Sequence, residues 1–269
     1  MRGSAMIEAC YGIKPLNTIE GIHCFGNERD GDYFDEDDVL SWRDGRFQNA
    51  IDDSKLFDNN ATRQMLYQLS KETNVIDLAS GPGMGLIPSL LRINPSIPCM
   101  ISDANLSLLR EWKIFLAEKP AFANIDFAQF SLMDIPFKDN SVSAYSSFIG
   151  LGSTRSGLAG YDHVVTEVFR TLKPGGKLFT VEVEWTNIPD IIDLFHKMNQ
   201  QPWDIFSESM ETGNRTWRDR FTDIGFRILY QELFEHRNLK ESDNELGKAA
   251  KKYGVEVGMD FNAFIVQKL

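Results

Sequence analysis

Short apolar runs alternate with longer amphipathic stretches from about residue 66 to the end of the chain. Strand-length runs separated by helix-length patterns predict a parallel sheet whose strands are joined by crossover helices. The strands expected in this part are residues 74–78, 99–102, 125–130, 143–149 and 177–184. The helices expected beside them are residues 84–93, 106–118, 161–172, 190–198 and 217–224. The pattern therefore predicts an α/β fold.

Two β-rich runs close the chain, residues 226–234 and 261–267, and only one polar, Lys-rich segment separates them. We expect them to pair as an antiparallel hairpin, which gives seven strands in all. Residues 1–60 lack the alternating rhythm and are interpreted as a helical, loop-rich N-terminal cap or lid, followed by one domain over residues 61–269. The first five residues, MRGSA, have the character of an added tag and carry no weight here.

Composition narrows the choice of partner and compartment. The 28 basic and 39 acidic residues give a formal net charge of −11, which disfavours nucleic acid as a partner. No run approaches the roughly 18 apolar residues of a membrane-spanning helix, so no span is expected. Three scattered cysteines do not form a disulfide framework, and a reducing cytoplasm fits them best. The oligomeric state is left open.

The segment Val75–Gly85, with the sequence VIDLASGPGMG, joins a predicted strand to a glycine-rich turn. Glycines in that position let a ligand approach the backbone at the start of a helix. Dinucleotide sites and S-adenosylmethionine sites both use such a turn, but the dinucleotide fingerprint needs a third glycine where this chain has Leu86. Asp77 at the strand end would repel a pyrophosphate and suits a ligand with an ammonium group. These details favour S-adenosylmethionine.

Two further carboxylates follow the next two predicted strands. Asp103 can accept hydrogen bonds from the vicinal hydroxyls of a ribose, although it could also cap the helix that follows. Asp134 can accept from an adenine amino group, with Met133 and Ile135 as an apolar slot for the ring. Because the carboxyl ends of parallel strands meet at one edge of a sheet, we expect Asp77, Asp103 and Asp134 to line one site.

The stretch from about Asn74 to Val183 resembles the class I S-adenosylmethionine-dependent methyltransferases, and within them the methyltransferase type 11-like branch that acts on small molecules. The motifs that carry the resemblance are Asp77-x-Ala-x-Gly-x-Gly83, Asp103, Asp134-Ile-Pro-Phe-x-Asp-Asn-Ser141 and Arg170-Thr-Leu-Lys-Pro-Gly-Gly176. The resemblance implies a Rossmann-like, seven-stranded, mostly parallel sheet that ends in an antiparallel hairpin.

By the same resemblance the cofactor is S-adenosylmethionine and the product S-adenosylhomocysteine. Gly81 and Gly83 line the methionine portion, and Ser147 and Phe148 flank the sulfonium and its methyl group. The full set of expected cofactor-binding residues is Asp77, Ala79, Ser80, Gly81, Gly83, Asp103, Ala104, Met133, Asp134, Ile135, Ser147 and Phe148.

The expected reaction is an in-line displacement that transfers a methyl group to a small molecule. A general base is needed only for a hydroxyl or a protonated amine, and no catalytic residue is assigned. No metal site is expected, because His23 and Cys24 have no second pair at ligand spacing. The acceptor pocket is expected between the strand ends, the cap and residues 184–206. Aromatic residues in those regions are Tyr11, Phe25, Tyr33, Phe34, Trp42, Trp185, Trp203 and Phe206.

Three alternatives stay open. The chain could methylate RNA or protein, which its acidic charge disfavours. It could be a binding or regulatory module that holds S-adenosylmethionine without turnover. A dinucleotide oxidoreductase is the most distant of the three.

Overall fold

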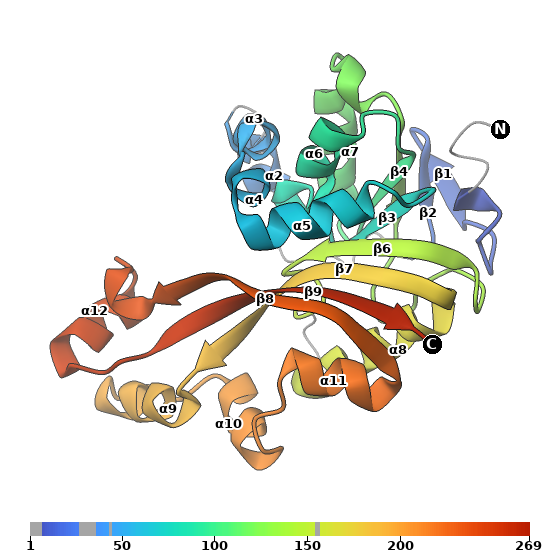
Figure 1. Ribbon diagram of the computed structural model, residues 1–269. Coiled ribbons are helices and arrows are strands. Elements are labelled where there is room, and N and C mark those ends of the chain that lie inside the picture. Colours follow the sequence, from blue (N-terminus) through green and yellow to red (C-terminus); the bar gives the residue numbers. More distant parts are fainter. Residues whose placement is uncertain (1–6, 27–35, 43–44, 154–156) are drawn as a thin grey trace.

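A single sheet of nine strands forms the centre of the molecule (Figure 1). The structure is a computed structural model, and it describes residues 7–26, 36–42, 45–153 and 157–269. The strands are β1 (Asn17–Ile19), β2 (Ile22–Cys24), β3 (Val75–Leu78), β4 (Cys99–Asp103), β5 (Ile125–Gln129), β6 (Val142–Phe148), β7 (Leu172–Thr186), β8 (Phe226–Asn238) and β9 (Gly258–Lys268). Their order across the sheet is β1-β2-β5-β4-β3-β6-β7-β9-β8.

Helices cover both faces of this sheet. They are α2 (Glu36–Trp42), α3 (Arg46–Asp52), α4 (Lys55–Asp58), α5 (Asn60–Leu69), α6 (Ile87–Ile93), α7 (Leu106–Leu116), α8 (Gly157–Thr171), α9 (Ile188–Lys197), α10 (Asp204–Glu211), α11 (Trp217–Ile224) and α12 (Glu245–Tyr253). Short 3₁₀ turns are η2 (Gly81–Gly83), η3 (Pro120–Phe122) and η4 (Leu239–Glu241). Figure 1 shows α5, α6 and α7 on one face and α8 and α11 on the other.

The strand order reverses at β3, which places the site. The chain runs from β3 through β4 to β5 on one side, then returns to β6 and β7 on the other, and all these strands are parallel. All four residues of β3 are buried, as expected for a strand that is covered on both faces. In such sheets the crevice at the reversal point, outside the carboxyl ends of the strands, is where ligands bind.

The α/β fold, the mostly parallel sheet and the antiparallel C-terminal hairpin are confirmed: β9 pairs antiparallel with both β7 and β8. The expected strand count of seven was too low. β1 and β2 form an antiparallel pair, and β2 lies parallel to β5 with His23 opposite Ala128. Each has only three residues, too few to show a period of two, so this part of residues 1–60 did not look like sheet. The domain boundary at residue 60 stays a prediction.

Beyond the core, the long strands β8 and β9 extend as an arm that carries α9, α10 and α12 (Figure 1). This arm has its own apolar cluster, which includes Ile191, Leu194, Phe206 and Ala250. The exposed Lys248, Lys251 and Lys252 lie on α12, within the polar, Lys-rich segment that separates the last two strands. In the described part of the chain, no helix is long and apolar enough to cross a membrane.

Candidate active site

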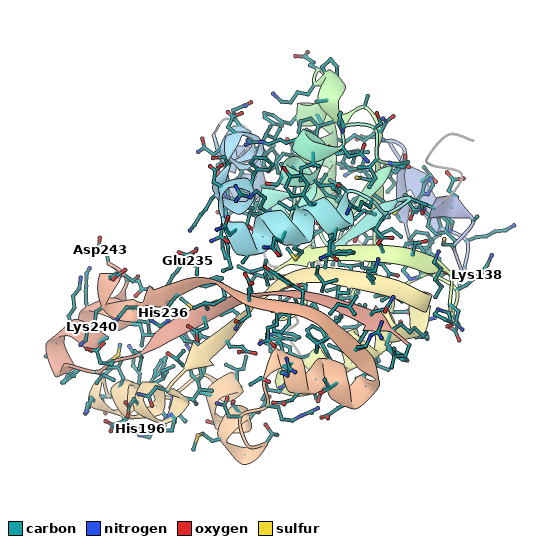
Figure 2. The ribbon with its side chains drawn as sticks, in the orientation of Figure 1. Lys138, His196, Glu235, His236, Lys240 and Asp243 are labelled. Carbon is teal, nitrogen blue, oxygen red and sulfur yellow. The ribbon has the colours of Figure 1, made fainter. Side chains whose placement is uncertain are left out.

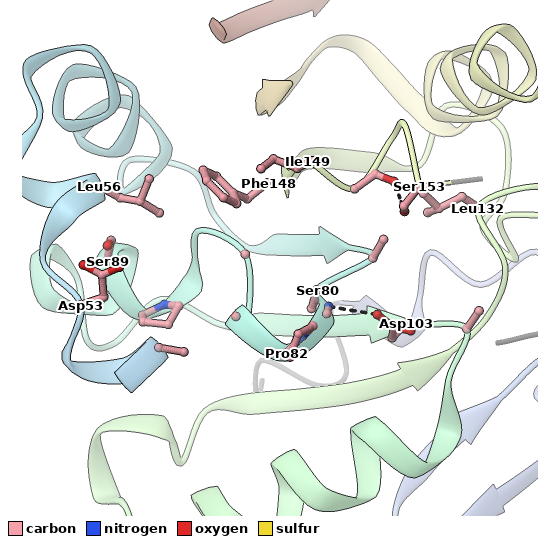
Figure 3. A pocket seen from close by; sticks show the side chains of 18 of the residues that line it. Asp53, Leu56, Ser80, Pro82, Ser89, Asp103, Leu132, Phe148, Ile149 and Ser153 are labelled. Atoms are coloured by element: carbon pink, nitrogen blue, oxygen red, sulfur yellow. Dashed lines mark hydrogen bonds between the residues drawn. The ribbon is translucent and has the colours of Figure 1, made fainter. Parts of the chain in front are cut away.

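A cavity of about 710 Å³ opens where the carboxyl ends of β3, β4 and β6 meet (Figure 3). Its walls come from the turn after β3, the ends of β4 and β6, the loop after β5, the helices α3 and α4, and the arm strand β8. Eight of the twelve predicted cofactor-binding residues line it, namely Ala79, Ser80, Gly81, Gly83, Asp103, Ala104, Met133 and Phe148. The residues that sequence reasoning brought together from four separate segments thus share one cavity wall.

The glycine turn presents bare backbone to this cavity. A Cβ atom built at Gly81 or Gly83 would meet nothing within 4 Å, so both positions face open space. Gly81 also has a φ of +56°, a conformation that favours glycine. A ligand can therefore approach the main chain here more closely than side chains would allow.

Asp77 lies beneath the turn and does not line the cavity. Its carboxylate is fully buried, and its Oδ1 accepts a hydrogen bond of 2.5 Å from the Ser146 hydroxyl. A Cβ atom at Gly85 would lie 2.3 Å from Oδ2, which has no hydrogen-bond partner among the described residues. Burial raises the pKa of Asp77 to about 7. In this position Asp77 supports the turn from below, and its predicted contact with a ligand ammonium stays a prediction.

Asp103 joins two loops through its two oxygens. Oδ2 accepts from the Gly81 backbone N–H at 2.9 Å (Figure 3). Oδ1 accepts from the Asn105 backbone N–H at 2.9 Å. The cap of α7 is Asn105, whose side chain accepts from the Leu108 N–H, so Asp103 is not the helix cap. Burial raises the pKa of Asp103. Each carboxylate oxygen keeps a second acceptor site, which fits the predicted contact with ribose hydroxyls.

Trp112 holds the glycine turn from the other side. Its indole N–H donates to the Gly81 carbonyl at 3.0 Å, and its ring is fully buried and stacks on Phe47 with 3.8 Å between the centroids. Trp112 thus belongs to the hydrophobic core as well as to the support of the turn. Its hydrogen bond to Gly81 could not be predicted, because helical spacing reports which face of a helix is buried and not which atom the indole nitrogen contacts.

The segment after β5 places only one of its three predicted residues in the cavity wall. Met133 lines the cavity, whereas Asp134 is exposed and Ile135 is buried in the core. The Ile135 N–H donates to Glu167 Oε2 at 3.1 Å, and its carbonyl accepts from Arg170 at 2.8 Å. The motif that begins at Asp134 is therefore fastened to α8, and adenine recognition by Asp134 and Ile135 stays a prediction.

At the end of β6, only one of the two predicted residues lines the cavity. Phe148 lines the cavity and meets Phe234 of β8 edge to face at 6.3 Å between centroids. Ser147 is fully buried and its hydroxyl donates to the Leu78 carbonyl at 3.3 Å. Side chains alternate between the two faces of a strand, so Ser147 points to the opposite face of β6 from Phe148, and it does not line the cavity.

Comparison with known proteins assigns the chain to a family. Residues 50–207 match the model of the ubiE/COQ5 methyltransferase family, which is more than half of the chain. The chain belongs to this family. The resemblance to class I methyltransferases and the Rossmann-like fold that it implied are thereby confirmed.

Individual relatives of the ubiE/COQ5 methyltransferase family cover only part of the chain. The ubiquinone/menaquinone biosynthesis C-methyltransferase UbiE of Francisella tularensis is 30% identical over 119 residues, which is 44% of this chain and 46% of that protein. The demethylmenaquinone methyltransferase of Listeria monocytogenes is 25% identical over 143 residues, 53% of this chain and 58% of that protein. The chain thus spans about half the length of these relatives.

Among solved structures, a geranyl diphosphate methyltransferase in complex with GPP and sinefungin is similar in fold. Its TM-score is 0.51 at 12% identity, and the match covers 77% of this chain and 76% of that one. At this identity the likeness concerns the fold alone.

Sequence reasoning expected the N-terminal cap beside the acceptor pocket, but it named none of the residues that α3, α4, the turn between them and the arm contribute to this wall. These residues are Arg46, Ala50, Asp53, Lys55, Leu56, Phe234 and Arg237. The Lys55 ammonium pairs with Glu235 Oε2 at 2.7 Å, and Figure 2 shows Glu235 where the arm passes these helices. No local pattern marks this contact, because 180 residues separate its two members.

A second cavity, of about 640 Å³, adjoins the first and shares Ile149, Ser153 and Arg237 with it. Of the aromatic residues expected around an acceptor, Trp185 and Phe206 line this second cavity. Tyr33 and Phe34 lie outside the described residues. The other four, Tyr11, Phe25, Trp42 and Trp203, line neither cavity.

Proposed function

We propose that the protein transfers a methyl group from S-adenosylmethionine to a small molecule. The observation that carries the proposal is one cavity shared by a bare glycine turn from β3 and the Asp103 carboxylate from β4. An open backbone turn and a carboxylate at the next strand end suit a ligand that has an amino-acid part joined to a ribose. The family supports the same donor.

The residues of the cavity fit this donor in chemical terms. Gly81 and Gly83 would contact its methionine portion, Asp103 its ribose hydroxyls, and Met133 its adenine ring. Bound there, the sulfonium supplies an activated methyl group with a neutral thioether as leaving group. The protein's own contribution is to position the acceptor and to exclude water, which is a large part of what such a displacement needs.

The residues around the cavity and the net charge of the chain both support a small molecule as the methyl acceptor. Residues of α3, α4 and β8 form part of the cavity wall, and the net charge of −11 opposes binding to a polyanion. The sequence relatives are named for ubiquinone and menaquinone, both small molecules. A cytoplasmic location stays a prediction.

Calorimetric titration with S-adenosylmethionine, S-adenosylhomocysteine and NADH tests the donor. We expect the two sulfur compounds to bind and NADH to be silent. Asp103→Ala is expected to weaken S-adenosylhomocysteine binding by about 1–3 kcal/mol, because the two ribose hydroxyls of the ligand would lose their hydrogen-bond acceptor. Glu232→Ala, which removes an exposed carboxylate outside both cavities, is the control. Unchanged affinity in Asp103→Ala, or binding of NADH alone, would contradict the assignment.

A further inference from the structure

The second cavity is built on the last part of β7, with walls from α8, α9, α10, α11, β8 and β9. Two carboxylates, Glu182 and Glu184, project into it from β7. They are two residues apart on a strand, so they point to the same face. Both are withdrawn from water: Glu182 has 1% of its surface exposed, and Glu184 is partly buried.

The second cavity is connected to the proposed donor site through the loop after β6. Ile149 and Ser153 of this loop line both cavities. Glu182 is fixed to the same loop, because its Oε1 accepts from the Leu151 N–H at 3.3 Å as well as from the Thr180 hydroxyl at 2.6 Å. A molecule in the second cavity would therefore lie beside the end of β6, where the methyl group is expected.

No cationic side chain of the described residues forms an ion pair with either glutamate. Glu184 accepts instead from two neutral groups, the Trp217 backbone N–H at 2.8 Å and the Asn262 side-chain amide at 3.2 Å. Burial raises the pKa of Glu182 to about 8 and also raises that of Glu184. An uncompensated carboxylate in such surroundings gains most from a ligand that brings a cation.

The other charged groups of this wall already have partners. Arg220 and Arg215 both pair with Asp162, and Arg215 pairs with Asp223 as well. Arg237 pairs with Glu235 at 2.9 Å, and Asp260 pairs with His236 at 2.6 Å. The carboxylates that balance these arginines, Asp162, Asp223 and Glu235, lie outside the cavity wall. Each of these arginines thus has a carboxylate partner outside the cavity wall, whereas neither glutamate has a cationic partner among the described residues.

Aromatic side chains complete the chamber. Trp217 and Phe206 are buried, Trp185 is partly buried and meets Phe206 edge to face at 5.2 Å, and Tyr161 stacks on Trp217. Ring faces attract cations, and the Arg220 guanidinium already lies 5.5 Å from the Tyr161 ring centre. Aromatic walls with paired carboxylates suit an alkylammonium group better than a neutral or anionic one.

We propose that this second cavity is the acceptor chamber, and that Glu182 and Glu184 select an acceptor that carries a protonated amine. The proposal rests on the proposed methyl transfer. The amine nitrogen gives a proton to Glu182, and its freed lone pair forms the bond to the methyl carbon. The electron pair of the broken carbon–sulfur bond stays on sulfur, and the product is a methylated ammonium ion.

The first test compares two probes of the same shape on the full chain with S-adenosylhomocysteine present. We expect 2-phenylethylamine to bind at least about tenfold more tightly than 2-phenylethanol at pH 8, a ratio that one charge-assisted contact can supply. Titration at pH 7 in phosphate and in Tris buffer should show proton release on binding, as the carboxyl of Glu182 ionises. Equal affinities for the two probes would overturn the proposal.

Variants then assign the selectivity to the two glutamates. Glu182→Gln and Glu184→Gln keep the size and hydrogen-bonding shape of the side chain, and each should reduce the amine preference at least about threefold, while their combination should bring it close to one. Glu232→Gln, an exposed carboxylate outside the chamber, is the matched control and should keep the full preference. A preference that survives in the double variant would overturn the proposal. Should the double variant fail to fold, Glu184→Gln alone still decides, because Glu184 accepts from only two neutral groups.

The same titrations separate this inference from the proposed function. S-adenosylhomocysteine should bind to the wild-type protein and to both glutamine variants with similar affinity, because Glu182 and Glu184 lie outside the donor cavity. Binding of S-adenosylhomocysteine without an amine preference would overturn only the acceptor chamber. Failure of S-adenosylhomocysteine to bind at all would overturn the proposed function and, with it, the chamber.

Discussion

At the scale of single residues, the glycine turn is held by hydrogen bonds to both the backbone N–H and the backbone carbonyl of Gly81. Asp103 accepts from the Gly81 N–H, and Trp112 donates to the Gly81 carbonyl. Two glycines of this turn have different roles. Gly83 faces open space in the cavity, and Gly85 leaves room for the Asp77 carboxylate beneath the turn. The glycines of one motif are therefore required for different physical reasons.

Substitution of these two glycines should separate binding from folding. Gly83→Leu is expected to abolish S-adenosylhomocysteine binding with little change in Tm, because its side chain enters open space in the cavity. Gly85→Ala should instead lower stability by about 1–3 kcal/mol, since Gly85 has a φ of +53° and its Cβ would lie 2.3 Å from Asp77 Oδ2. Thermal unfolding and calorimetry measure the two effects. The reverse pattern would contradict the roles given to the two positions.

At the scale of elements, the N-terminal helices are fastened to the arm beside the cavity. Lys55 of α4 pairs with Glu235 of β8, the Asn59 amide donates to the Phe234 carbonyl at 3.0 Å, and the Tyr230 hydroxyl donates to the Ala61 carbonyl at 3.0 Å. These contacts cross from one end of the sequence to the other. They hold together two parts of the chain that both line the cavity.

Loss of the ion pair should speed exchange of the ligand with little effect on the fold. Lys55→Met is expected to raise the dissociation rate of S-adenosylhomocysteine by at most about fivefold, because half-exposed ion pairs contribute about 0.2–1 kcal/mol. Stopped-flow displacement measures this rate. Lys71→Met, which changes an exposed lysine beyond α5, is the control and should leave the rate unaltered. A rate in Lys55→Met equal to that of the control would show that the ion pair does not hold the helices closed.

The central elements of the fold could be predicted from the sequence, whereas one sheet edge and the contact between distant elements could not. The five central parallel strands and the helices between them were predictable, because apolar periodicity is local and each segment carries its own. The glycine turn and Asp103 could be placed together because the ends of adjacent parallel strands meet. The strands β1 and β2 were too short to show a period, and the contact of α4 with β8 joins residues too far apart for any local signal.

At the scale of the whole molecule, two buried carboxyls make stability depend on pH. Burial raises the pKa of Glu182 to about 8 and that of Asp77 to about 7, both above the values of an unfolded chain. Between about pH 4 and pH 7 the folded protein therefore holds protons that the unfolded chain has released. Folding takes up protons in this range, so the contribution of these groups is favourable at low pH and is lost as pH rises.

We expect Glu182→Gln to flatten this dependence. In the wild-type protein the free energy of unfolding should fall between pH 5 and pH 8 by up to about 1.4 kcal/mol per pH unit for each such group. The variant should lose the part due to Glu182 and be relatively more stable at pH 8. Urea unfolding at several pH values measures the two curves. Parallel curves would mean that Glu182 is ionised in the folded protein across this range.

The order of the strands also bears on how the protein avoids self-association. An unpaired strand edge invites pairing with another chain, which can lead to aggregation. The apolar core strand β5 would be such an edge, but β2 covers it, and the outermost strand β1 has only three residues. The opposite edge is β8, which is long and exposes Leu229 and Leu233. Charged side chains such as Arg227 and Glu232 interrupt it, so β8 is the edge where loss of charge would most readily start assembly.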